Sequence, residues 1–229
     1  MKLKINIFIL LFSLTSLLYS QAGNAYYKKQ LSLDTNHSDM KKALSSLENS
    51  EYKLSFNESE SLYSKVKNMD LNDSPIAQAF LKGISGFDGE VYFNKKKNKN
   101  LHKREFAGGN YLIKKNEIKW ILSKDTLNID RYTCYKASTT RIIENQEGKH
   151  KLKVTAWYAP QIPLPYGPDG YCGLPGLILQ LDNNGTTTSL KKIEFSNKNL
   201  NIDFIPTGKE MSEDEFKKRV SEIYKNRKN

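Results

Sequence analysis

The sequence has only two cysteines and three histidines, and this scarcity excludes several kinds of site. A structural zinc ion needs four clustered Cys or His ligands. His37, His102 and His150 do not lie at ligand spacing from either cysteine. Gly-x-Ser-x-Gly, His-Glu-x-x-His and Cys-His signatures of hydrolases are also missing. We therefore expect no metal, no cofactor and no catalytic residue, and a hydrolase is the least favoured function.

Long apolar runs are equally scarce, because the only one lies at the start of the chain. Lys2 and Lys4 precede an apolar stretch from residue 5 to 18, which is the pattern of a secretory signal peptide. That stretch is too short to span a bilayer comfortably. We expect residues 1–20 to be cleaved after Ser20, with cleavage after Ala25 as the alternative. The mature chain, residues 21–229, would be one domain without a membrane span, located in the periplasm or secreted.

Acidic residues are fewer than basic residues, and the formal net charge is +11. Removal of the leader lysines lowers this charge by two, to about +9. The lysines are interleaved with asparagines, as in residues 94–100. This pattern is typical of a solvated surface, and an exported protein is not expected to bind nucleic acid.

The chain is rich in aromatic residues, with 13 Tyr and 10 Phe, which favours β structure. Apolar and polar residues alternate in many short runs, which predict strands joined without intervening helices. We expect a mainly β (α+β) fold, a curved antiparallel sheet or half-barrel of about ten strands. The expected strands cover 25–33 (an edge strand), 52–56, 90–93, 101–106, 110–114, 118–123, 132–140, 151–158, 177–181, 189–195 and 199–205. Gly108 and Gly109, which lie between two of these strands, predict a hairpin turn.

Helices are expected near each end of this sheet. Residues 36–39 can cap a helix that continues to about Glu48, with apolar residues at three-four spacing. Ser212 and Glu215 form a capping-box pattern at the start of a closing amphipathic helix. A shorter helix over residues 76–81 is expected within a long loop.

Five of the seven prolines fall between Pro160 and Pro175. Proline cannot donate a backbone hydrogen bond, so this segment predicts a long ordered loop instead of a strand. Residues 174–177 fit a type II turn in which Gly176 supplies a positive φ. Aromatic residues in and beside this loop are a candidate binding surface: Trp157, Tyr158, Tyr166 and Tyr171.

The two cysteines, Cys134 and Cys172, lie in the mature chain. An even pair in an exported protein most often forms a disulfide. Two free buried thiols are the alternative, and a catalytic or metal-binding role is the least favoured.

The residues around the loop resemble those of the GLPGLI family. Its name is spelled by Gly173, Leu174, Pro175, Gly176, Leu177 and Ile178. Further matches in the family's order are Trp120, Tyr132-x-Cys134-x-Lys136-Ala137, Ala156-Trp157-Tyr158, Ile162-Pro163, Gly167-Pro168 and the block 52–63. Two positions depart from the pattern: Arg131 stands where many members have Gly, and Cys172 is not regular in the family. The resemblance implies an exported protein of Bacteroidota type with no established activity.

The hexad is either a tight turn that feeds a core strand or part of a binding surface. We expect a non-catalytic binding or carrier module for an apolar or envelope ligand, such as a lipid. The alternative is a structural protein that docks on an outer-membrane partner. A carrier would need a curved sheet around an apolar cavity, and this expectation is an analogy of fold only.

Overall fold

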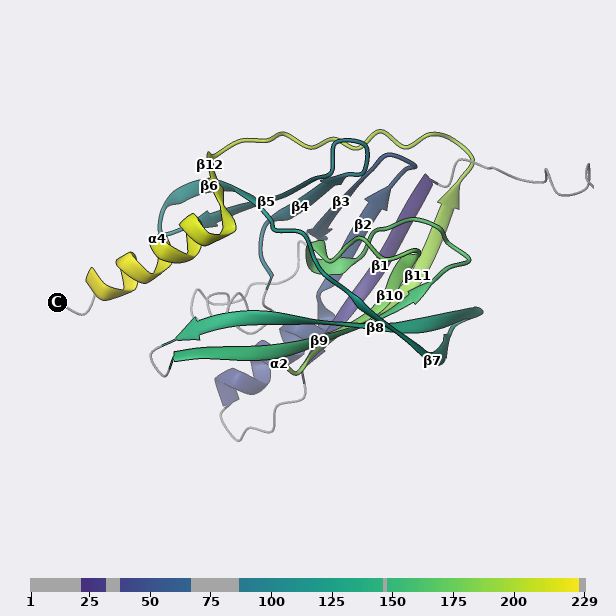
Figure 1. Cartoon of the computed structure of the whole chain (residues 1–229), viewed down its shortest axis with the longest axis horizontal. Coiled ribbons are helices and arrows are strands. Elements are labelled where there is room, and N and C mark those ends of the chain that lie inside the picture. The colour runs from purple at the N-terminus through teal and green to yellow at the C-terminus, as the bar shows by residue number, and fades with distance from the viewer. Residues whose placement is uncertain (1–21, 32–37, 67–86, 146–147, 227–229) are drawn as a thin grey trace, which may run out of the picture.

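The computed structural model describes residues 22–31, 38–66, 87–145 and 148–226. All twelve strands in these residues belong to one sheet, in the order β12-β6-β5-β4-β3-β2-β1-β11-β10-β9-β8-β7 (Figure 1). The first six are β1 (Ala22–Leu31), β2 (Glu51–Phe56), β3 (Glu60–Lys65), β4 (Glu90–Asn94), β5 (Lys99–Phe106) and β6 (Gly109–Lys114). The others are β7 (Ile121–Ile129), β8 (Tyr132–Asn145), β9 (Gly148–Ala159), β10 (Leu177–Asn183), β11 (Thr186–Ser196) and β12 (Lys209–Ser212).

The mainly β fold is confirmed, but the predicted half-barrel of about ten strands is wrong. The sheet has twelve strands, is open and is not strongly curled. Among the described strands every pairing is antiparallel except that of β12 with β6. The Pro/Gly loop packs on one face of the sheet and contributes side chains to its hydrophobic core. This face is therefore occupied by the loop, and not by the apolar cavity that the carrier analogy required.

Several local predictions are confirmed. α2 (Ser38–Asn49) and α4 (Glu213–Asn226) are the expected helices. The amide of Glu215 donates to Ser212 Oγ at 3.2 Å, and the amide of Ser212 donates to Glu215 Oε2 at 2.7 Å, which is the predicted capping box. Ala107 and Gly108 (φ +49° and +77°) form the β5–β6 hairpin turn that the glycines predicted. The expected helix at 76–81 lies outside the described residues.

Two strand predictions are wrong. β1 lies in the middle of the sheet, between β2 and β11, and is not an edge strand. Residues 199–205 are not a strand: this segment leaves β11 and runs across the ends of β2 to β5 towards β12 (Figure 1). Phe204 stacks there on Tyr92, with ring centroids 4.7 Å apart. Ile202, which is buried, and Phe204 therefore cover the sheet, and the segment does not extend it.

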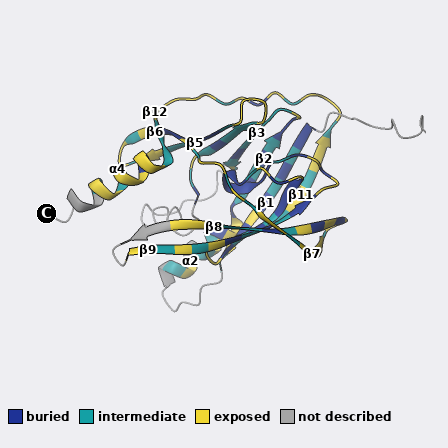
Figure 2. Cartoon of the chain, in the orientation of Figure 1, coloured by how far each residue is buried: buried dark blue, intermediate teal, exposed yellow. Residues whose placement is uncertain are grey.

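Buried and exposed residues alternate along the strands, so the sheet has one covered face and one more exposed face. On β1, Ala25, Tyr27 and Lys29 are buried, whereas Lys28 and Gln30 are exposed. The covered face meets the Pro/Gly loop, whose short helix η1 (Pro168–Gly170) contacts β3 and β4. Near β6 the same face meets α4, where the Phe216 ring packs edge-on against Tyr111. Figure 2 shows this division as dark blue strands in the middle of the sheet and yellow segments on α4 and on β7 to β9.

Candidate functional site

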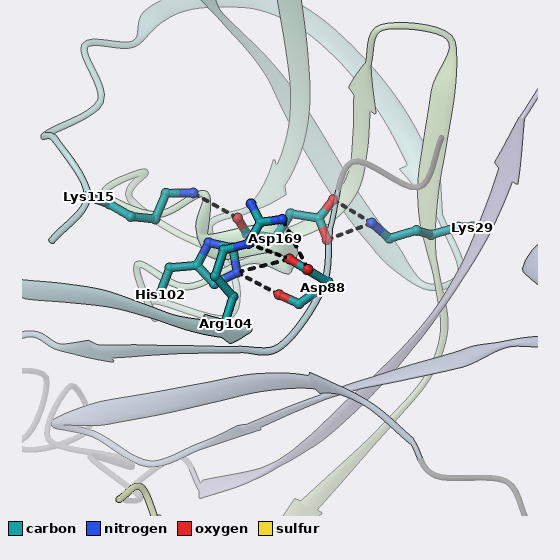
Figure 3. Close-up of polar contacts among 6 residues, drawn as sticks. All are labelled: Lys29, Asp88, His102, Arg104, Lys115 and Asp169. Atoms are coloured by element: carbon teal, nitrogen blue, oxygen red, sulfur yellow. Dashed lines mark hydrogen bonds and ion pairs between the residues drawn. The ribbon is translucent and has the colours of Figure 1, made fainter. Parts of the chain in front are cut away.

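A buried ion pair joins the middle of the sheet to the Pro/Gly loop. Lys29 Nζ lies 2.7 Å from both carboxylate oxygens of Asp169 (Figure 3). The Lys29 side chain is 0% exposed and that of Asp169 is 8% exposed. The ammonium group also lies 4.9 Å from the ring centroid of Tyr52 and 5.2 Å from that of Phe87. The positive charge is therefore held by one carboxylate and by aromatic faces.

Local backbone geometry brings Asp169 to this position. Asp169 has φ +57° and ψ +17°, a left-handed conformation that Asp tolerates better than most residues, and Gly170 follows at φ +78°. Burial lowers the pKa of Lys29, and the charge of Asp169 opposes that effect. Burial, followed by the charge of Asp169, raises the pKa of Tyr63 well above its ordinary value. The Tyr63 hydroxyl therefore remains protonated at alkaline pH values at which an exposed tyrosine would ionise.

A second polar group lies beside this pair, around Asp88. Arg104 Nη2 donates to Asp88 Oδ2 at 3.0 Å, and Arg104 Nε forms an ion pair with Oδ1 at 2.9 Å whose alignment is too poor for a hydrogen bond (Figure 3). His102 Nε2 donates to the backbone carbonyl of Asp88 at 2.6 Å. The imidazole stacks on Phe87, and burial lowers the pKa of His102 to about 3. His102 is therefore neutral at physiological pH.

The Pro/Gly loop is also held by its own backbone. The amides of Gly173, Leu177 and Ile178 donate to the carbonyls of Pro165, Ile162 and Tyr166 at 2.9–3.0 Å. Tyr27 Oη donates to the carbonyl of Ile178 at 2.8 Å. These bonds tie the hexad to the first half of the loop and to β1, so the ion pair is one of several connections.

The hexad residues divide between a buried turn and two exposed positions. Leu174, Gly176, Leu177 and Ile178 are buried, whereas Gly173 and Pro175 are exposed. The predicted positive φ at Gly176 is wrong, because the positive φ of the hexad belongs to Gly173, at +90°. Glycine is needed at 176 for another reason: a Cβ there would lie 2.4 Å from the carbonyl oxygen of Ala159. The loop passes too close to the end of β9 to admit a side chain.

The candidate binding residues do not form one exposed surface. Tyr166 is fully buried and packs edge-on against Phe93, and Tyr158 and Tyr171 are buried in a second core cluster. Trp157 is only partly buried, and Lys136 Nζ lies 5.7 Å from its ring centroid. Trp157 is thus the member of this set that remains on a partly open face.

The predicted disulfide is not formed in the structure, where Cys134 and Cys172 are both free. Cys134 is buried in the core cluster, and its thiol donates to the carbonyl of Tyr132. Cys172 lies in the loop, where Asn100 Nδ2 donates to its sulfur at 3.4 Å. The two side chains therefore have separate surroundings. Burial raises the pKa of each thiol to about 11, which keeps both protonated at neutral pH.

One face of the β7–β9 region combines apolar and basic side chains. The register places Lys136 opposite Trp157, Thr140 opposite Lys153 and Ile142 opposite Lys151, and Ile121 pairs with Ser138 on the same face. Ile121 is 72% exposed and Ile142 is 55% exposed. We call this surface the limb face and define it by Ile121, Lys136, Ile142, Lys151, Lys153 and Trp157.

Sequence reasoning missed Lys29 and Asp169. One signal was available: Lys29 shares its parity with Tyr27 and Leu31, so alternation placed a lysine on an apolar face. A lysine in that position needs a partner, but nothing local in the sequence identified Asp169, which is 140 residues away. Among the described residues, no group of three or more His, Cys, Asp or Glu side chains is arranged to hold a metal.

Comparison with protein families gives one match. A family model described as a protein of unknown function (Porph_ging) matches residues 141–180, which include all of β9, the Pro/Gly loop and the hexad. The chain is thus similar, over this short segment, to a Bacteroidota-type family without a known function. No curated protein matches the chain.

Two solved structures of PNGF-II, in space groups C2 and P21, resemble the fold. The first has a TM-score of 0.54 and 13% identity and covers 87% of this chain and 32% of that chain. The second has a TM-score of 0.53 and 14% identity and covers 87% and 33%, respectively. The chain therefore spans about a third of the length of the PNGF-II chains, and at this identity the likeness concerns the fold alone.

Proposed function

We propose that this chain is a non-catalytic binding module of the cell envelope that contacts anionic lipid through its limb face. The observation that supports this function is that exposed apolar side chains, Ile121 and Ile142, share one face of β7, β8 and β9 with Lys151 and Lys153. Apolar side chains that enter the bilayer interface, next to lysines that meet anionic head groups, are the two components of peripheral membrane binding.

The ion pairs beneath the Pro/Gly loop support a structural role for this loop. Lys29 and Asp169 neutralise each other, and Arg104 pairs with Asp88. These charges are engaged in holding buried segments together. The limb face, in contrast, has side chains whose apolar surface is exposed to solvent. For this reason we propose binding to a lipid surface and not transport of a lipid in an internal cavity.

The test is binding of the mature protein to vesicles of phosphatidylcholine, with or without phosphatidylglycerol, measured by cosedimentation. Binding should require the anionic lipid and weaken with salt. Ile142→Ser should weaken it by about 1–2 kcal/mol, since the apolar side chain no longer enters the interface. The matched control is Ile205→Ser, which alters an isoleucine that is 69% exposed but lies outside the limb face.

Equal weakening by the two isoleucine variants would contradict the proposal, as would binding that ignores lipid charge. The corresponding charge variants are Lys151→Gln with Lys153→Gln on the limb face, and Lys96→Gln with Lys97→Gln in the β4–β5 turn as control. Each lysine near an anionic surface contributes about 1 kcal/mol, so only the limb pair should reduce binding strongly.

A second candidate function is docking of an extended protein segment along β7. This strand is an outer strand of the sheet, and it exposes Leu122 and Leu127. A partner strand could pair with its outer edge, which is paired with no other strand of the described residues. The edge is interrupted by a bulge between Leu122 and Thr126 and by the charged residues Lys124 and Asp125. Bulges and charges of this kind protect edge strands against non-specific pairing, so only a matching segment would dock here. Protein docking without vesicle binding would favour this function.

We also propose that residues 1–20 are an export signal, that residues 21–229 form one domain, and that the protein belongs to the GLPGLI family. β1 begins at Ala22, and both Ala22 and Ala25 are buried. Cleavage after Ala25 would remove four residues that are paired with β2 or β11, whereas cleavage after Ser20 leaves the strand intact. N-terminal sequencing of the exported protein should therefore find Gln21 first. A chain that began at Tyr26 or Met1 would contradict this prediction.

A further inference from the structure

The limb face carries an exposed ion pair where β7 meets β8. Lys136 Nζ donates to Asp125 Oδ2 at 3.0 Å. The same ammonium group lies 5.7 Å from the ring centroid of Trp157, which is opposite Lys136 on β9. The Lys136 side chain is 32% exposed and that of Asp125 is 58% exposed. The limb face therefore presents one cationic and one anionic group side by side to solvent.

The bulge in β7 brings Asp125 to this position. The register leaves residues 123–125 of β7 opposite Lys136 alone. Within this bulge the amide of Asp125 donates to Ser123 Oγ at 3.2 Å. Bulges commonly re-aim a side chain of the strand that contains them. Here the bulge places a carboxylate next to the lysine of the neighbouring strand.

The ion pair leaves hydrogen-bonding capacity on both partners. An ammonium group has three donors, and a carboxylate has about four acceptor positions. Lys136 is bound to one carboxylate oxygen, Oδ2 of Asp125. Because both side chains are exposed, a ligand can reach the remaining positions without breaking the pair. A ligand that matches them carries an anionic acceptor for Lys136 and a cationic donor for Asp125, and is therefore a zwitterion.

We propose that Asp125 and Lys136 select a zwitterionic lipid head group with a primary amine, that of phosphatidylethanolamine. Its phosphate would accept from Lys136 and its ammonium group would donate to Asp125, and both hydrogen bonds are charge-assisted. The quaternary amine of phosphatidylcholine has no N–H group and would not make the second bond. This inference rests on the proposed function: Lys151 and Lys153 attract anionic lipid, and the ion pair adds a choice between zwitterionic lipids.

The experiment compares two kinds of vesicle that contain the same fraction of phosphatidylglycerol. The remaining lipid is phosphatidylethanolamine in one kind and phosphatidylcholine in the other, and cosedimentation of the mature protein measures binding. We expect about fivefold tighter binding to the vesicles with phosphatidylethanolamine, which is the scale of one exposed ion pair. Equal binding to both kinds would overturn the inference and leave the proposed function intact. Binding to neither kind would refute both.

Two matched variants separate recognition of the head group from a general effect of lipid packing. Asp125→Asn should remove the preference for phosphatidylethanolamine, because a neutral amide forms no ion pair with the ammonium group. Asp130→Asn should keep the preference, because Asp130 is also exposed but lies in the β7–β8 turn, outside the limb face. A preference that persists in Asp125→Asn would arise from the bilayer itself and would overturn the inference.

The lysine variants show that the two kinds of lipid recognition are independent. Lys151→Gln with Lys153→Gln should weaken binding to both kinds of vesicle, since both contain anionic lipid. The ratio between the two kinds should stay at about fivefold, because Asp125 and Lys136 are unchanged. Loss of the preference in this variant would assign it to the lysine pair and contradict the role of Asp125.

Discussion

The Pro/Gly loop and the limb face use charge in opposite ways. Under the loop, Lys29 is removed from water and paired with Asp169 at 2.7 Å. On the limb face, Lys151 and Lys153 are exposed beside Ile142. A buried charge that loses its partner is costly, whereas exposed charges contribute little to folding stability. The comparison indicates that the charges under the loop serve stability, whereas those of the limb face contribute little to it and are the ones that the proposed function uses.

The largest effect should come from breaking the buried pair. Asp169→Asn keeps a residue that tolerates positive φ but leaves Lys29 without its carboxylate, and we expect a loss of about 3–5 kcal/mol in the free energy of unfolding. Urea denaturation measures this loss. The double variant Lys29→Met with Asp169→Asn should recover a large part of it, since no unpaired charge remains buried. If the single variant were as stable as the parent, the ion pair would not hold the loop.

Gly176→Ala should be the next most damaging change. Its Cβ would lie 2.4 Å from the Ala159 carbonyl oxygen, and such overpacking costs about 1–3 kcal/mol. Gly173→Ala provides the comparison, because position 173 has no atom within 4 Å of an added Cβ and pays only for its positive φ, about 1 kcal/mol. Thermal denaturation of both variants ranks the two costs. A larger loss at Gly173 would show that turn conformation, and not close approach, makes the hexad glycines necessary.

Acid should weaken the region under the loop through His102. The folded state has a His102 pKa of about 3, below the ordinary value of 6.5, so between these values the unfolded chain binds a proton that the folded chain does not. Stability therefore falls as the pH drops, by about 2 kcal/mol between pH 7 and pH 5. His102→Gln keeps a donor for the Asp88 carbonyl and should lose less over this interval. Equal losses in urea denaturation at the two pH values would show that another group is responsible.

The smallest effect on folding is expected on the limb face. Ile142→Ser and the Lys151→Gln, Lys153→Gln pair should change the free energy of unfolding by less than about 0.5 kcal/mol, because these side chains are exposed. The same denaturation measurements apply. A loss comparable to that of Gly176→Ala would mean that the limb face is part of the core and would remove its contrast with the loop.

The sequence alone was sufficient for elements whose signals are local. Alternation in residues 52–56 predicted β2, and the Ser212–Glu215 pattern predicted the start of α4. Glycines predicted the β5–β6 turn, and the density of prolines predicted the ordered loop. These features depend on neighbours within a few positions, where backbone conformation and side-chain periodicity act directly.

Only the tertiary structure decided which segments meet. The parity of Lys29 was visible, but its partner lies 140 residues away and reaches it through a left-handed residue in the loop. The need for glycine at 176 comes from the end of β9, not from the turn itself. The limb face exists because register places Ile142 beside Lys151 and Trp157 beside Lys136. Strand order and loop placement depend on packing between residues that are far apart in the sequence. Local sequence patterns do not show which of these distant residues come into contact.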